Sequence, residues 1–251
     1  IIGDGVLRRI RLDGHGVGTR NGAYVFHDDD HPAGWFQDFV TGVKQSWSMS
    51  GHGRLTESDR EAIKQERIRR EQERAELQAN AIKKVRAEYD ATQPCDAHPY
   101  LAFKNGGTLA TLRVDSRGTL LVPVWDDHGN LISLQRIFMR DGKWEKRFEK
   151  GCRLSGGMFW FGGHTDTIRI CEGLATGFSI HKETGDCIYV AFSAGNLITV
   201  AKALRECFPT QRIVICADND ENTPGNPGLT KAKEAAKAIG GELSVPPISG
   251  D

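Results

Sequence analysis

The sequence predicts an α/β fold in which the main domain is a parallel sheet flanked by helices. From residue 167 onward, short continuous apolar runs alternate with helical segments, as expected when parallel strands are buried on both faces. The expected strands are 167–171, 187–192, 212–217 and 242–245, and the expected helices are 175–183, 197–207 and 229–239. Smaller parts precede this domain, so the chain as a whole is mixed α+β.

The first two parts of the chain differ sharply in composition. Residues 1–54 are rich in Gly and aromatic side chains, and the short runs 8–12, 23–26 and 45–47 predict strands of a small β element. Residues 55–94 begin with a helix-start signal at Thr56–Asp59 and contain neither Gly nor Pro before Pro94. This pattern predicts a long charged connecting helix. The alternative is a helix whose basic side contacts DNA.

Residues 95–163 predict a small basic α+β subdomain. A short helix is expected at 98–103 because Pro99 suits the first turn. Strands are expected at 111–114, 120–125, 131–138 and 144–148, with hairpin turns at 127–130 and 140–142. The parallel-sheet domain then occupies residues 164–251.

Acidic side chains follow two strands of the predicted parallel sheet. Glu172 follows the first strand, and Asp218 and Asp220 follow the third. The carboxyl ends of parallel strands meet at one edge, where active groups gather. Clustered carboxylates repel one another and favour a hard divalent cation, so the pattern predicts a Mg²⁺ or Mn²⁺ site. Each motif alone is also compatible with an ordinary polar turn.

The second expected strand opens into a helix start with small and polar residues. Ser193, Gly195 and Asn196 lie where backbone N–H groups of a first helical turn can hold an anion. These three residues are therefore predicted to contact nucleotide.

These motifs resemble the Toprim domain of bacterial primases, topoisomerases and nucleases. The string from Glu172 to Gly177 is similar to the E-G-Y-A-T-A motif of conjugative-plasmid, satellite-phage and prophage primases, with departures at Leu174 and Gly177. Residues 121–137, the basic segment 146–151 and the aromatic-Gly step 159–162 also resemble primases. The resemblance covers residues 95–251, and residues 1–54 resemble the region that precedes the core in such primases.

The resemblance implies the catalytic core of a DNA primase, which makes short RNA primers on single-stranded DNA for a plasmid, phage or integrated element. It implies Glu172 as the catalytic acid and Asp218 and Asp220 as Mg²⁺ ligands. Template or triphosphate contacts are expected from basic side chains, since Arg and Lys bind phosphates. The candidates are Arg113, Arg136, Lys146, Arg147 and Lys150. The alternative for these cations is an ordinary charged sheet surface.

Two other functions stay open beside primase activity. One is another Toprim chemistry, that of a nuclease or topoisomerase, and the other is a non-catalytic module that binds single-stranded DNA. The expected partners of a primase are the template, ribonucleoside triphosphates and a replicative helicase or a fused helicase domain outside this segment. Neither the template start sequence nor the helicase can be inferred.

Composition limits the classes of protein to which the chain can belong. The 251 residues carry 33 Lys+Arg and 33 Asp+Glu, so nucleic-acid binding must rely on local clusters of charge. No apolar run approaches the roughly 18 residues of a membrane span, which argues against a membrane partner. The six cysteines form no C-x-x-C pair, so no zinc ribbon is encoded, and a bacterial cytoplasm is expected. The first residue, Ile1, favours a fragment of a longer protein.

Overall fold

The computed structural model describes residues 1–13, 20–28, 32–48, 57–219 and 226–246. These residues form two compact units, Ile1–Arg70 and Glu71–Asp251, and helix α1 (Glu57–Ala91) runs through the boundary between them. In the part of the chain that is described, no helix combines the length and apolarity needed to cross a membrane.

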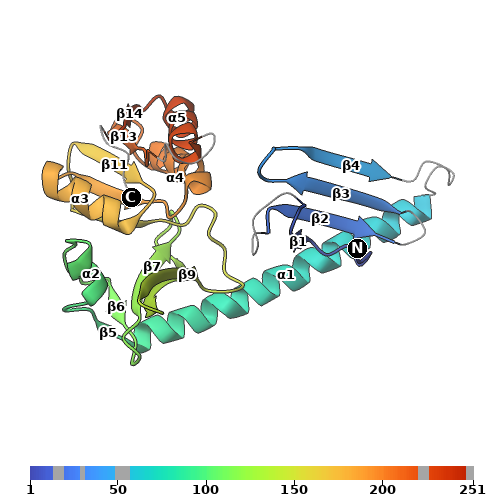
Figure 1. Ribbon diagram of the computed structural model, residues 1–251, viewed down its shortest axis with the longest axis horizontal. Helices are drawn as coiled ribbons and strands as arrows, with labels where there is room; N and C mark the ends of the chain where they lie inside the picture. The colour runs from blue at the N-terminus through green and yellow to red at the C-terminus, as the bar shows by residue number, and fades with distance from the viewer. Residues whose placement is uncertain (14–19, 29–31, 49–56, 220–225, 247–251) are drawn as a thin grey trace. The chain divides into compact units, whose positions relative to one another are not determined.

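The first unit contains a four-stranded antiparallel sheet, drawn in blue in Figure 1. Its strands follow in chain order: β1 (Arg8–Ile10), β2 (Gly22–His27), β3 (Ala33–Asp38) and β4 (Lys44–Ser48). The sequence predicted three of them and missed β3. Pro32 and Gly34 hide that strand, because both residue types are depleted from strands and read as turn signals.

Helix α1 begins and ends as its charge pattern predicts, and its last turns pack on the second unit. Val85 and Tyr89 are buried against Leu121, Leu131 and Leu134 of the following sheet. Leu77, eight residues before Val85 on the same helix, is by contrast 70% exposed. The helix is therefore held in the second unit by its carboxyl-terminal part.

The second unit opens with a five-stranded antiparallel sheet. Its strands lie in chain order: β5 (Gln93–Pro94), β6 (Arg113–Val114), β7 (Leu120–Trp125), β8 (Leu131–Arg140) and β9 (Lys143–Phe148). Helix α2 (Pro99–Phe103) is capped by His98, whose Nδ1 accepts a hydrogen bond from the N–H of Tyr100 at 3.1 Å. Because strand side chains alternate, Leu121 and Leu134 pack against α1, whereas Val122 and Ile137 face the opposite way.

The second sheet of this unit is the predicted α/β layer. It has the strand order β10-β12-β11-β13-β14, from β10 (Phe159–Phe161), β11 (Thr167–Cys171), β12 (Cys187–Val190), β13 (Arg212–Cys216) and β14 (Glu242–Ser244). Four strands are parallel, but β10 pairs antiparallel with β12, so the sheet is mixed at this edge. The sequence described residues 159–162 only as an aromatic step and missed this strand.

Three helices cover the two faces of this sheet (Figure 1). Helices α4 (Ala194–Cys207) and α5 (Pro227–Ile239) pack on one face. Helix α3 (Leu174–Thr184) packs on the other face, where the core continues into β7 and β8 of the antiparallel sheet. This shared core joins the two sheets and leaves the carboxyl edge of the parallel strands beside β9.

Candidate active site

The parallel strands bring Glu172 and Asp218 to one edge of the sheet. Strands β11 and β13 are neighbours, with Ile170 opposite Ile215. Continuing this register by two positions places Glu172 opposite Ala217, one residue before Asp218. The two acids predicted at strand ends are therefore close in space, although they are 46 positions apart in the sequence.

Two buried thiols lie directly below these carboxylates. Burial raises the pKa of the Cys171 thiol well above its usual range, and the nearby charges of Cys216, Asp218 and Glu172 raise it further. Both carboxylates therefore lie close enough to act on the same sulfur atom. An added positive charge at this edge would stabilise this crowded arrangement.

A groove of about 800 Å³ opens beside the carboxylates, along helix α3. Asp218 and Asn219 line it together with three cations, Lys104, Lys146 and Arg169. Its other lining residues come from α3 and from the ends of β13 and β14, and include Gly173, Thr176, Ser179, Glu183 and Ser244. A groove with carboxylates and cations suits a ligand that combines a polyanion with a divalent cation.

The third predicted carboxylate, Asp220, lies outside the described residues. Among the residues that are described, no three His, Cys, Asp or Glu side chains come together as a metal-ligand group. Just before Asp220, the side chain of Asn219 is buried and accepts a hydrogen bond from Asn226 Nδ2 at 2.8 Å. This bond ties the end of β13 to the start of α5. Glu172 and Asp218 therefore fit a divalent cation as a partial oxygen-ligand set.

Strand β9 separates the predicted basic residues onto two faces. Lys146 is opposite Ile137, which faces the shared core, and its ammonium lies 5.7 Å from the Tyr100 ring centroid at the groove. Arg147 is opposite Arg136 on the face that packs against α1. It pairs with Glu145 at 2.7 Å. Lys150 is exposed beyond the end of the strand.

Arg136 and Arg113 hold helix α1 on the sheet. Both terminal nitrogens of Arg136 donate to Glu88 of α1 at 2.6 Å, and Glu149 accepts from the same guanidinium at 2.7 Å. The Arg113 guanidinium lies 5.1 Å from the Tyr89 ring centroid and donates to the Thr92 carbonyl. These contacts give both residues a structural role, and neither lines the groove, in contrast to the expected role in substrate binding.

The start of helix α4 differs from the sequence expectation at Asn196. Its amide donates to the carbonyls of Gly157 and Ala191 and accepts from the N–H of Gly156, all at 2.8 Å. The side chain is buried and all of these partners are backbone groups, so it stabilises the loop before β10 instead of facing a ligand. Ser193 and Gly195 stay predictions: Ser193 is the N-cap residue, without a side-chain capping bond, and Gly195 is exposed.

Two groove residues were missed from the sequence. Arg169 lies inside β11, and its Nε donates to Asp186 at 2.6 Å. A charged residue within an otherwise apolar strand was the available signal. Lys104 follows α2 and had no signal, because only the packing of α2 beside the parallel sheet brings it to the groove.

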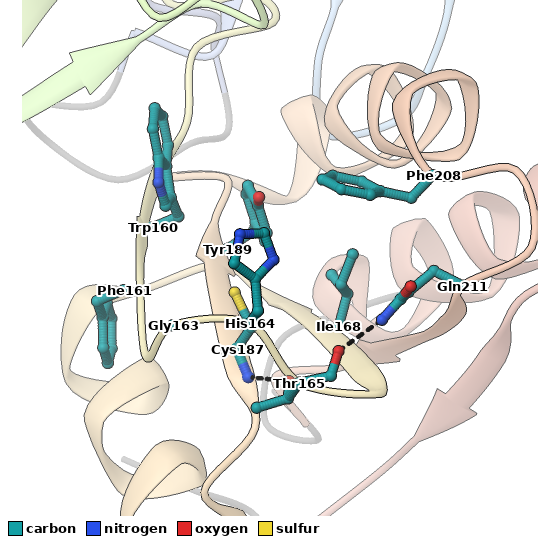
Figure 2. Close-up of a pocket in the computed structure, with 10 residues that line it drawn as sticks. All are labelled: Trp160, Phe161, Gly163, His164, Thr165, Ile168, Cys187, Tyr189, Phe208 and Gln211. Atoms are coloured by element: carbon teal, nitrogen blue, oxygen red, sulfur yellow. Dashed lines mark hydrogen bonds between the residues drawn. The ribbon is translucent and has the colours of Figure 1, made fainter.

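A separate pocket opens at the opposite, amino-terminal edge of the parallel strands (Figure 2). Aromatic rings dominate it, with Trp160 and Tyr189 stacked 6.0 Å apart and Phe208 across from them. None of its lining residues is Asp, Glu, Lys or Arg. Thr165 forms part of its floor, accepting from Gln211 and from the Cys187 N–H. The pocket lacks the charged groups that mark the carboxyl edge.

Comparisons with known proteins identify relatives of this chain. Residues 167–251 match the family described as Toprim domain. Two Escherichia coli proteins called DNA primase TraC align with 97% of this chain, at 34% identity over 257 residues and 32% over 272. The chain spans 24% of the length of the first and 18% of the second.

Two solved structures are more distant. A DNA primase domain from Pseudomonas aeruginosa covers 56% of this chain and is itself covered to 50%, at 16% identity and a TM-score of 0.39. The DnaG primase catalytic domain bound to ssDNA covers 56% of this chain and is covered to 51%, at 14% identity and a TM-score of 0.37. Residues 167–251 are a Toprim domain, and nearly the whole chain is related to a segment of the longer DNA primase TraC proteins, as the motifs predicted.

Proposed function

We propose that this chain is the catalytic core of a DNA primase, a nucleotidyltransferase that joins ribonucleotides on a single-stranded DNA template. The observation that carries the proposal is the meeting of Glu172 and Asp218 at one sheet edge, beside a groove that also presents Lys104 and Lys146. The relatedness to DNA primase TraC supports the same reaction.

The proposed cofactor is Mg²⁺ or Mn²⁺, held by Asp218 with Asp220 and reached by Glu172 directly or through water. When bound, such an ion would offset the negative charge of the triphosphate and would favour ionisation of the attacking hydroxyl. Lys146 and Lys104 would bind triphosphate or template phosphates from across the groove. Glu172 would accept or relay the proton of the primer 3′-hydroxyl.

The wider setting follows from the proposed reaction. The proposed partners are ribonucleoside triphosphates, the template and a helicase, either separate or elsewhere in a longer polypeptide. The proposed location is the bacterial cytoplasm, where these substrates occur, and the proposed host is a plasmid, phage or integrated element.

The deciding experiment follows labelled ribonucleotides into primers on a single-stranded template while Mg²⁺ or Mn²⁺ is titrated. Glu172→Gln and Asp218→Asn should each lower the rate about 100-fold or more, because each removes a group that acts on the reacting atoms. The control is Glu234→Gln, an exposed acid on α5 that pairs with Lys231. Wild-type rates in both site variants, or metal-dependent cutting of DNA with no primer formed, would contradict the proposal.

A further inference from the structure

The sheet of the first unit carries a row of side chains that crosses all four strands on one face. The register places Arg9 opposite Ala23, Ala23 opposite Gln37, and Gln37 opposite Lys44. Trp35 lies two residues before Gln37 and so shares its face. Two cations therefore end the row, roughly 14 Å apart at their Cα atoms, which is three inter-strand spacings.

Aromatic rings accompany both cations. The Arg9 guanidinium lies 4.1 Å from the ring centroid of Phe39, and the Lys44 ammonium lies 5.7 Å from that of Trp35. Arg9 and Lys44 are exposed, Phe39 is 47% exposed, and Trp35 is partly exposed. We name Arg9, Trp35, Gln37, Phe39 and Lys44 the basic face.

Arg9 and Lys44 of the basic face differ from several other cations of the first unit in their surroundings. Within the described ranges, no carboxylate lies within salt-bridge distance of Arg9 or Lys44. On the opposite face, by contrast, Arg8 pairs with Asp4 at 2.5 Å. The nearby Asp38 carboxylate accepts hydrogen bonds from Val40 and Thr41, so it serves the turn between β3 and β4.

From this charge and these rings, we propose that the basic face binds single-stranded nucleic acid. Arg9 and Lys44 contact successive stretches of the phosphate backbone, while the rings of Phe39 and Trp35 stack on bases. Sequence-tolerant binding of single strands uses two elements, cations that follow the phosphate backbone and aromatic side chains that stack on bases. The basic face has both. A duplex offers the phosphates but hides its bases, and an anionic lipid surface offers no stacking partner. The site goes beyond the proposed active site, and it rests on the proposed function only in that the strand would be the primase template.

The first test measures the affinity of the whole 251-residue chain for a fluorescent single-stranded oligodeoxynucleotide by anisotropy, without divalent metal. The double variant Arg9→Ala with Lys44→Ala should weaken binding tenfold or more. It should also reduce the slope of log affinity against log salt by about 1.4, from two lost phosphate contacts. The matched control is Lys64→Ala with Arg69→Ala, which removes equal charge from cations of the same unit that pair with Glu61 and Glu66.

The second test addresses the rings. Trp35→Leu and Phe39→Leu keep an apolar side chain but remove the stacking surface, so each should weaken binding about fivefold or more. Phe39→Tyr keeps the ring and should bind like the wild type. Charge-preserving Arg9→Lys with Lys44→Arg should also retain affinity, which separates loss of contact from loss of folding.

Several outcomes would overturn the proposal. These are unchanged affinity in the alanine double variant, an equal loss in the control pair, duplex binding that matches single-strand binding and depends equally on the rings, or a preference of the basic face for anionic phospholipid vesicles. The Asp218→Asn variant separates this proposal from primase activity. If it makes no primer but binds the oligonucleotide through Arg9 and Lys44, the basic face stands whatever the catalytic reaction is.

Discussion

The two faces of the antiparallel sheet in the second unit use their basic residues differently. On the face toward α1, Arg113, Arg136 and Arg147 are each engaged by carbonyls, carboxylates or aromatic rings. On the groove face, Lys146 has no carboxylate within salt-bridge distance among the described residues and lines the groove beside Asp218. Cations on the first face stabilise the fold, whereas the cation on the second is available to a ligand.

The largest expected effect is on the groove face. Lys146→Ala should lower kcat/KM for ribonucleotide incorporation about 10- to 100-fold, since a charge-assisted hydrogen bond contributes about 1.5–3 kcal/mol. The free energy of unfolding should be unchanged, because Lys146 is exposed. The matched control is Arg147→Ala, the next residue of the same strand on the opposite face, which should keep kcat/KM. Equal losses in both variants would mean that overall charge, and not the groove, governs the rate.

The next effect tests the α1 face. Arg136→Met should lower the free energy of unfolding by about 2 kcal/mol, less than for a fully buried pair because Glu88 and Glu149 keep part of their exposure. It leaves two carboxylates close together without their shared cation. Adding Glu88→Gln should recover part of the loss. Urea denaturation of the single and double variants checks both statements, and primer synthesis by the folded fraction should persist.

The sequence predicted which residues lie at the ends of the parallel strands, but not which face of the antiparallel sheet lines the groove. Glu172 and Asp218 were found because parallel strands place their carboxyl ends at one edge, which depends only on strand order. The alternation of β9 already separated Lys146 from Arg147, but nothing in it indicated which face meets the groove. That depends on the docking of α1 and α3, which is tertiary packing.

Local motifs also misled where a side chain hydrogen-bonds to backbone groups that are distant in the sequence. Asn196 reads as part of an anion-binding helix start, but its amide bonds to Gly156 and Gly157, about 40 positions away. Strands β3 and β10 were missed because their residues also suit turns or aromatic steps. Asp220 lies outside the described residues, so its part in the site stays a prediction.

The smallest expected effect is the pH dependence of the stability that Glu88 contributes on the α1 face. The hydrogen bond from Arg136 lowers the pKa of Glu88 below its ordinary value of 4.5. A carboxyl with a depressed folded-state pKa contributes stability that is fully present above the unfolded-state pKa and is lost as pH falls through the folded-state pKa. The wild type should therefore exceed Glu88→Gln in unfolding free energy by up to about 1 kcal/mol from pH 7 to pH 5, as for a partly exposed pair.

This difference should shrink as the pH falls below about 4.5, the ordinary Glu88 pKa, and vanish in stronger acid. Thermal unfolding of both proteins across this range checks the prediction. Glu71→Gln, an exposed acid on the same helix, should track the wild type at every pH. A difference between wild type and Glu88→Gln that stays constant down to strong acid would show that Glu88 stabilises α1 by packing and not by its charge. The assignment of this face to ion-paired stability would then rest on Glu149 and on the pair of Arg147 with Glu145.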